Sequence, residues 1–239
     1  MKPTDMEIRY ALDMIEDLMG TGLKDALGYV ADENNAKWYH LNISQWLDKN
    51  IDYLNKNGIR YCMGSTKLVL LTNQLKNWVI KLNFDRSTDP YYVEEGLVMD
   101  FCQIEADNYQ RAVENDLGEY FAATYNVGKV NDTNVYLQEK AEVDEYFFDR
   151  MVEYAKDREW VKREDFEDEE KYREALEQCV WEDFDEEDRL EAVFGGEVDR
   201  LCKLFDFVND NEINDLHENN FGITPDGRYL VIDFSGFSD

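Results

Sequence analysis

Apolar residues in the first part of the chain recur with the period of a helix. They return every three or four positions from Ile8 to Leu18, and glycines at positions 20 and 22 interrupt the pattern. A second periodic stretch runs from about Ala36 to Leu54. Residues 1–57 are therefore expected to form an N-terminal helical extension.

The period changes after Gly58. Short β-rich runs at 59–61, 68–71 and 78–82 are separated by turn residues, which predicts three antiparallel strands. One long helix is predicted over Tyr91–Asn115 and ended by Gly118. Two further strands are predicted at Tyr120–Val130 and Asn134–Glu139, joined by a turn at Asn131 and Asp132.

The remainder of the chain is expected to be mostly helical. Residues 144–200 are strongly acidic but compatible with solvated helices, and Glu197–Asn209 predicts a core helix. The apolar stripe expected on that core helix consists of Val198, Leu201, Leu204, Phe205 and Val208. The fold class is therefore α+β, with a sheet and one helix over 58–141 and a reduced, mostly helical part over 142–239.

The net charge restricts the partners. The 239 residues carry 25 Lys and Arg against 54 Asp and Glu, a formal charge of −29. Such a chain is repelled by nucleic-acid backbones and by anionic membranes. Two interpretations stay open: a solvated, soluble surface, or an acidic decoy for the basic groove of a DNA-binding partner.

Zinc-binding and targeting signals are absent from the sequence. The four cysteines and the two histidines, His40 and His217, show no metal-ligand spacing, which argues against a zinc site. No stretch of about 18 apolar residues occurs, and the N-terminus carries charges every few positions. A soluble cytoplasmic protein is expected.

Three polar residues near the end of the sequence have the chemistry that phosphoryl transfer requires. Asp215 lies in a predicted loop, and Asn220 follows it. Asp233 stands at the end of the predicted hairpin that comes next. Transfer from ATP needs a carboxylate to orient the acceptor hydroxyl, and an Asn and an Asp to hold magnesium.

The spacing of these residues resembles the protein-kinase pattern H-R-D-x-x-x-x-N followed by D-F-G. Asp215-Leu216-His217 and Asn220 look still more like the DLHxxN form of aminoglycoside and choline phosphotransferases and of atypical bacterial or phage kinases. The layout over residues 58–239 is similar to that of compact phage-encoded serine/threonine kinases. The resemblance implies a bilobal kinase-like fold in which Asn220 and Asp233 bind magnesium and Asp215 is catalytic.

The resemblance also implies an upstream lysine. Lys81 closes the run Trp78-Val79-Ile80-Lys81, like V-A-I-K, and would contact the α- and β-phosphates of ATP. Glu105, on the long helix, would be its ion-pair partner, with Glu95 and Glu114 as competitors.

Two further nucleotide contacts follow from the same resemblance. Gly64 and Ser65 would lie in the loop over the phosphates, although typical kinases carry three glycines there. Glu139 and Ala141 would belong to the hinge whose backbone receives adenine. A second departure is Ile213, which stands at the position of the histidine in H-R-D.

The function expected from these residues is an ATP- and magnesium-dependent kinase acting on protein Ser or Thr, with basic acceptors favoured by the acidic surface. A small-molecule acceptor stays open. The alternatives are a pseudokinase that acts by protein contact and an acidic inhibitor protein.

Overall fold

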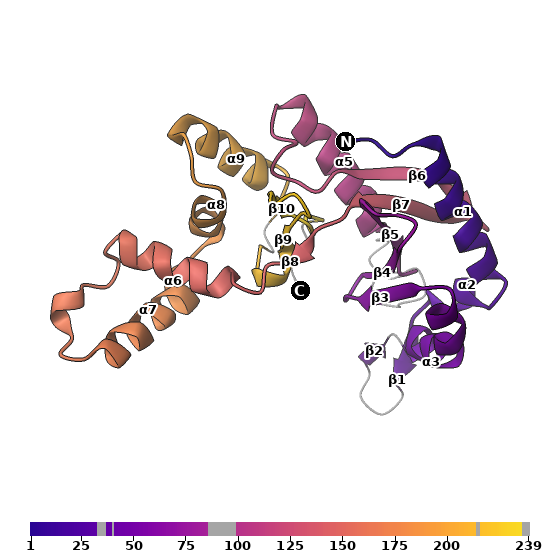
Figure 1. The fold of residues 1–239 in the computed structure, drawn as a ribbon, viewed down its shortest axis with the longest axis horizontal. Coiled ribbons are helices and arrows are strands. Elements are labelled where there is room, and N and C mark those ends of the chain that lie inside the picture. The colour runs from indigo at the N-terminus through magenta and orange to yellow at the C-terminus, as the bar shows by residue number, and fades with distance from the viewer. Residues whose placement is uncertain (33–36, 40, 86–98, 214–215, 236–239) are drawn as a thin grey trace. The chain divides into compact units, whose positions relative to one another are not determined.

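The structure is a computed structural model that describes residues 1–32, 37–39, 41–85, 99–213 and 216–235. It is an α+β protein (Figure 1). The chain divides into two compact units. Unit 1 comprises Met1–Tyr109 and Ala123–Lys140, and unit 2 comprises Gln110–Ala122 and Ala141–Asp239.

Unit 1 is built on a five-stranded antiparallel sheet with the order β3-β4-β5-β7-β6. The bounds are β3 Ile59–Met63, β4 Lys67–Thr72, β5 Trp78–Asn83, β6 Thr124–Val130 and β7 Thr133–Glu139. The five strands expected from the sequence are thus confirmed. The largest difference is the start of β6, predicted at Tyr120 and observed at Thr124, because the Ala122 N–H donates to the Val231 carbonyl in unit 2 instead.

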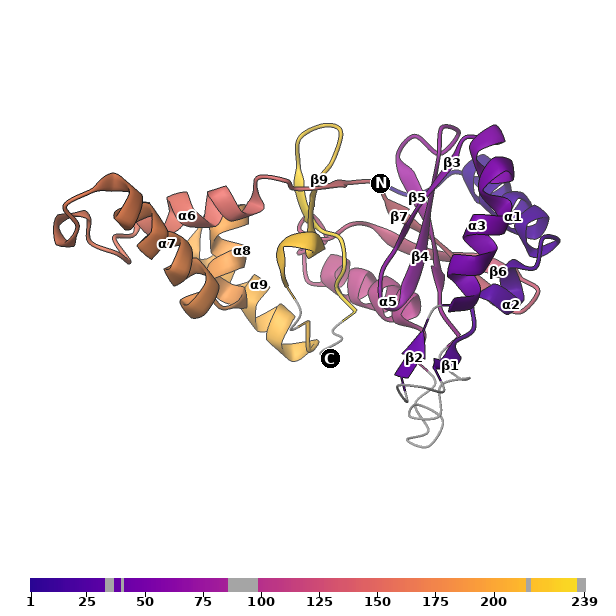
Figure 2. The ribbon, with the colours of Figure 1, turned by 90° about the horizontal axis from the view of Figure 1, so that it is seen from below.

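Helices cover both faces of this sheet. Figure 2 shows α5 (Phe101–Glu114) on one side, and α1 (Asp5–Met19) and α3 (Leu41–Lys56) on the other. The central strand β5 is consequently buried along almost its whole length. A short helix, α2 (Leu23–Ala26), follows α1.

The N-terminal segment packs on the sheet of unit 1. Thr4 and Glu7 form a capping box that fixes the first turn of α1, and α1 contacts β6 and β7. Between α2 and α3 the structure has an unpredicted hairpin of β1 (Val30–Asp32) and β2 (Lys37–Tyr39). The prediction of helix from Ala36 was wrong for residues 37–39, whose two aromatic residues favour a strand.

The described part of α5 is shorter than its predicted range. Residues 91–98 lie outside the described residues, and the helix is present from Phe101, after the Asp100 side chain accepts from the Gln103 N–H. It ends at Glu114, one residue before the predicted end at Asn115. Asp116 takes the left-handed conformation with φ 59°, and the Leu117 N–H returns to the Ala112 carbonyl at 2.8 Å.

Unit 2 combines helices with a small antiparallel sheet of order β10-β9-β8. The helices are α6 (Phe147–Asp157), α7 (Glu169–Asp183), α8 (Glu186–Phe194) and α9 (Val198–Asp210). The strands are β8 (Glu142–Val143), β9 (Phe221–Ile223) and β10 (Tyr229–Val231), and two short 3-10 helices are η2 (Arg163–Asp165) and η3 (Glu218–Asn220). The helices expected within the acidic segment 144–200 are confirmed.

Aromatic side chains form the core of unit 2. The Phe121 ring lies 5.4 Å from Phe207 and 5.2 Å from Phe234, and Phe147 stacks on Phe221 at 4.8 Å. The stripe expected on α9 is partly wrong: Val198 is 73% exposed, at the first position of the helix.

Acidic caps explain how the acidic segment folds as helices. Asp168 caps α7, and Asp185 forms a capping box with Asp188 at the start of α8. Carboxylates near a helix N-terminus are stabilised by its unpaired N–H groups. Burial, together with the repulsion of the Asp185 carboxylate, nevertheless raises the pKa of the Asp188 carboxyl to about 6.

The raised pKa of Asp188 predicts a pH-dependent penalty. The folded state holds this proton more tightly than the unfolded state, so the charged carboxylate destabilises the fold above about pH 6 and the penalty disappears towards pH 4. Asp188→Asn should raise the free energy of unfolding at pH 7 by up to about 1 kcal/mol, after discounting for solvent screening. Urea unfolding of both proteins from pH 4 to 7 measures this, and a difference independent of pH would contradict it.

Candidate functional site

The ion pair predicted between Lys81 and Glu105 is present in unit 1. Lys81 lies on the central strand β5 with 4% of its surface exposed, and Glu105 on α5 is fully buried. The Lys81 Nζ lies 2.9 Å from Glu105 Oε2 and 3.1 Å from Oε1. Both carboxylate oxygens therefore hold one ammonium group.

A second buried lysine, which the sequence reasoning missed, shares the same carboxylate. Lys67, at the start of β4, is 3% exposed, and its Nζ lies 2.7 Å from Glu105 Oε1. The available signal was its position two residues before Val69, on the same strand face as that apolar residue. A sequence cannot show that this face meets α5, so it does not reveal that this lysine contacts Glu105.

The strand register explains why these groups meet. Val69 pairs with Lys81, and side chains two residues apart share a strand face, so Lys67 and Lys81 project to the same side. Gln138 of β7 is on that side too, and its Nε2 lies 3.4 Å from Glu105 Oε2 and 3.0 Å from Thr124 Oγ1. One carboxylate thereby joins α5 to three strands of the sheet.

The charged groups of this cluster are buried, so each one depends on the others to compensate its charge. Desolvating a charge costs several kcal/mol unless partners compensate it. Glu105 is compensated by two ammonium groups and by the Gln138 amide. Burial, and next the Glu105 carboxylate, raise the pKa of the neighbouring Cys102 thiol well above its usual value, which keeps that cysteine neutral.

The predicted phosphate loop is the turn between β3 and β4. Gly64 and Ser65 are exposed there, and the Gly64 N–H donates to the Lys67 carbonyl at 3.0 Å. The Ser65 carbonyl accepts from the Tyr29 hydroxyl at 2.8 Å. The Phe84 N–H donates to the Thr66 carbonyl, so the turn is tied to the chain directly after β5.

The predicted hinge coincides with the junction of the two units. Glu139 ends β7, where its N–H donates to the Ala123 carbonyl at 2.8 Å and its carboxylate accepts from the Ala123 N–H. Ala141 begins the second segment of unit 2 and packs closely against Gly222 of β9. Both residues are therefore held by neighbouring backbone.

The two predicted magnesium ligands belong to backbone segments that lie side by side in unit 2. Asn220 ends η3 and is buried, and its carbonyl accepts from the Ile232 N–H at 2.8 Å. Asp233 follows Ile232 directly, so the hairpin of β9 and β10 places it next to Asn220. The Ser235 hydroxyl donates to Asp233 Oδ1 at 3.3 Å, and the buried Phe234 anchors the chain between them.

The loop before η3 is only partly described. Asp215, the predicted catalytic carboxylate, lies outside the described residues. Hydrogen bonds hold the residues that follow. The Leu216 carbonyl accepts from the Arg189 guanidinium of α8 at 3.1 Å, and His217 Nδ1 accepts from the Asn219 N–H at 3.2 Å. His217 therefore caps η3, which the sequence had marked only as part of the DLH pattern.

The donor set of unit 2 fits magnesium chemically. Asn220 and Asp233 offer amide and carboxylate oxygens, which are the ligands that Mg²⁺ prefers, with phosphate and water completing its shell. Within the described residues no group of three or more His, Cys, Asp and Glu side chains is arranged to hold a metal ion. A two-ligand site that relies on substrate oxygens is compatible with that finding.

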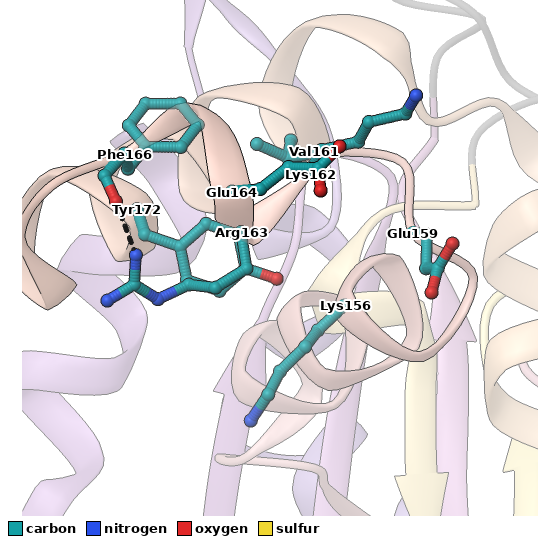
Figure 3. Close-up of a pocket in the computed structure, with 8 residues that line it drawn as sticks. All are labelled: Lys156, Glu159, Val161, Lys162, Arg163, Glu164, Phe166 and Tyr172. Carbon is teal, nitrogen blue, oxygen red and sulfur yellow. Dashed lines mark hydrogen bonds between the residues drawn. The ribbon is translucent and has the colours of Figure 1, made fainter.

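A cavity elsewhere in unit 2 contains none of the predicted site residues. It has a volume of about 660 Å³ and lies among the end of α6, η2 and the start of α7 (Figure 3). Arg163 is already bound there to the Phe166 carbonyl and to Glu169. Figure 3 shows the ammonium groups of Lys156 and Lys162 pointing in different directions, which does not make an anion cradle.

Comparisons with known proteins add no family. No protein-family model matches the chain, and neither a curated protein nor a solved structure matches it. Among the described residues, none of the helices has the length and apolar character to cross a membrane. The functional assignment therefore depends on the geometry of the side chains described above.

Glu105 is predicted to be the most sensitive member of the buried cluster. Glu105→Gln removes the carboxylate that both buried ammonium groups contact and should lower the free energy of unfolding by about 3–5 kcal/mol. Lys67→Met leaves the Lys81–Glu105 pair intact and should cost less. Chemical denaturation of both variants measures the difference, and an equal or smaller loss for Glu105→Gln would contradict this account.

Proposed function

We propose that this chain is an ATP- and magnesium-dependent phosphotransferase with a kinase-like bilobal fold, acting on a serine or threonine hydroxyl of a protein. The observation that carries the proposal is the buried Lys81–Glu105 ion pair between a central strand and the helix packed on it. Kinases use such a pair to hold a lysine at the α- and β-phosphates of ATP.

Unit 2 supplies the second part of the support. Asn220 and Asp233 stand in the order, spacing and hairpin context of kinase magnesium ligands. Bound magnesium would neutralise charge on the β- and γ-phosphates during transfer.

The chemical step follows from these roles. The acceptor oxygen forms a bond to the γ-phosphorus as the bond between that phosphorus and the β,γ-bridging oxygen breaks, so that ADP leaves. The hydroxyl proton passes to the Asp215 carboxylate, which also orients the acceptor. Lys81 remains charged throughout and stabilises the phosphates, and Glu105 holds it in position.

The remaining nucleotide contacts are assigned to backbone. Glu139 and Ala141 would receive adenine through their carbonyl and N–H groups, and Gly64 and Ser65 would cover the phosphates. Gly64 is exposed, which leaves room for a close approach of the phosphates. The acidic chain, with a charge of −29, favours a basic protein as the acceptor.

One observation favours a second candidate, a non-catalytic kinase-like binding protein. Lys67 and Lys81 both contact Glu105 and both are almost fully buried, so the cluster also works as a structural joint between α5 and the sheet. Magnesium-dependent nucleotide binding without phosphoryl transfer would support this candidate over the kinase.

Phosphoryl transfer is predicted to depend on Asp233. Purified protein incubated with labelled ATP and magnesium, alone and with a cell lysate, should transfer label to protein. Asp233→Asn and Asp215→Ala should each reduce transfer by at least about 100-fold. Asp210→Asn, which removes the same charge at the exposed end of α9, is the matched control and should be fully active. Label transfer that is absent, or identical in all variants, would contradict the proposal.

Gly64 provides a test of the phosphate loop that leaves the fold intact. Its φ lies outside the left-handed region, and a Cβ at this position would meet no described atom within 4 Å. Gly64→Ala should therefore unfold at the same urea concentration as the parent. If phosphates approach this backbone closely, the dissociation constant for Mg-ATP should rise by about 10-fold in calorimetry. An unchanged constant would remove Gly64 from the nucleotide site.

A further inference from the structure

Unit 2 contains an apolar groove that the proposed chemistry does not use. The groove has a volume of about 330 Å³ and lies among α6, α7, α8 and the loop leading into η3. Its walls include Phe147, Phe148, Met151, Trp181, His217 and Glu218. None of these residues is assigned to nucleotide or metal.

Trp181 is the most unusual residue of the groove. It is 68% exposed on α7, although the apolar face of that helix is otherwise buried. Its ring packs against Phe148 at a centroid distance of 5.2 Å. A large, exposed aromatic side chain beside a hollow is typical of the anchoring residues of protein interfaces.

Carboxylates follow this indole directly in the sequence. The segment 182–188 after Trp181 contains six Asp and Glu residues, and the exposed Glu218 forms part of the groove lining. The single arginine of the lining, Arg189, is bound to the carbonyls of Leu216 and Phe184. The groove therefore combines an apolar lining with one exposed carboxylate, and an acidic segment joins two of its lining residues, Trp181 and Arg189, which is complementary to an apolar side chain flanked by cations.

The groove wall belongs to the loop that carries the proposed catalytic carboxylate. His217 and Glu218 line the groove and follow Asp215 by two and three positions in the sequence. Arg189, which also lines the groove, holds the carbonyl of Leu216 in that loop. A segment anchored in the groove would be delivered beside this loop.

From these observations we infer that the groove binds the acceptor protein, through a segment with a bulky apolar residue flanked by lysine or arginine. The inference depends on the proposed kinase function for the role of the bound segment as acceptor. The binding itself depends only on the groove, so it can be measured without ATP.

The test uses fluorescein-labelled peptides of ten residues with one central serine. The first set is a positional library in which each peptide carries one phenylalanine and three arginines at varied positions. The second set replaces the phenylalanine by glycine, and the third replaces the arginines by glutamates. Fluorescence anisotropy without ATP should show binding by members of the first set alone. Trp181→Ala should weaken it at least about 10-fold, and added salt should weaken it as well. Val198→Ala, at an exposed apolar residue of α9 outside the groove, should leave it unchanged.

The outcomes separate this inference from the proposed function. With magnesium and labelled ATP, the bound peptides should be phosphorylated, and Trp181→Ala should raise their KM more than it lowers kcat. Binding that needs Trp181 without any transfer would retain the groove as a peptide site and overturn the kinase assignment. Binding indifferent to Trp181, or no binding by any apolar and basic member, would overturn the inference. A Trp181→Ala variant that changes the oligomeric state in sedimentation would also overturn it, because a second copy would then occupy the groove.

Discussion

Glu105 has no exposed surface, yet it carries a charge that Lys67, Lys81 and Gln138 compensate from three different strands. The loss of one partner of such a buried carboxylate strongly destabilises the folded state. The position of α5 on the sheet is consequently fixed by charge as well as by apolar contact. The same constraint holds the Lys81 ammonium at one place, which is the requirement that a phosphate-binding lysine has to meet.

In unit 2 the predicted site residues are held in position by backbone hydrogen bonds and not by a buried charge. The hydrogen bond from the Ile232 N–H to the Asn220 carbonyl couples the end of η3 to the strand end that carries Asp233. The aromatic contacts of Phe121 with Phe207 and Phe234 hold this hairpin to α9. The backbone at Asn220 and the backbone leading into Asp233 are thus held together by the fold.

Much of the acidity also has an identifiable structural role. Asp168 and Asp185 cap α7 and α8, and carboxylates in the first helical turns interact favourably with unpaired N–H groups. The cost is visible at Asp188, whose carboxyl has a pKa raised to about 6. The acidic residues 182–188 that follow Trp181 lie in this same segment, so one stretch of sequence both caps α8 and adds negative charge between two residues that line the apolar groove.

The sequence predicted the strands of the five-stranded sheet and the helices of the acidic segment, because these depend on local periodicity, and its motif order favoured Glu105 over Glu95 and Glu114 as the partner of Lys81. It also placed Asn220 and Asp233 around a hairpin. It missed the hairpin of β1 and β2 and placed the exposed Val198 on the apolar stripe of α9, where turn geometry and packing override periodicity. Only the tertiary structure decided that Lys67 shares Glu105 and that Trp181 borders a groove. Both depend on which faces of distant elements meet, and residue spacing along one strand or helix does not encode that.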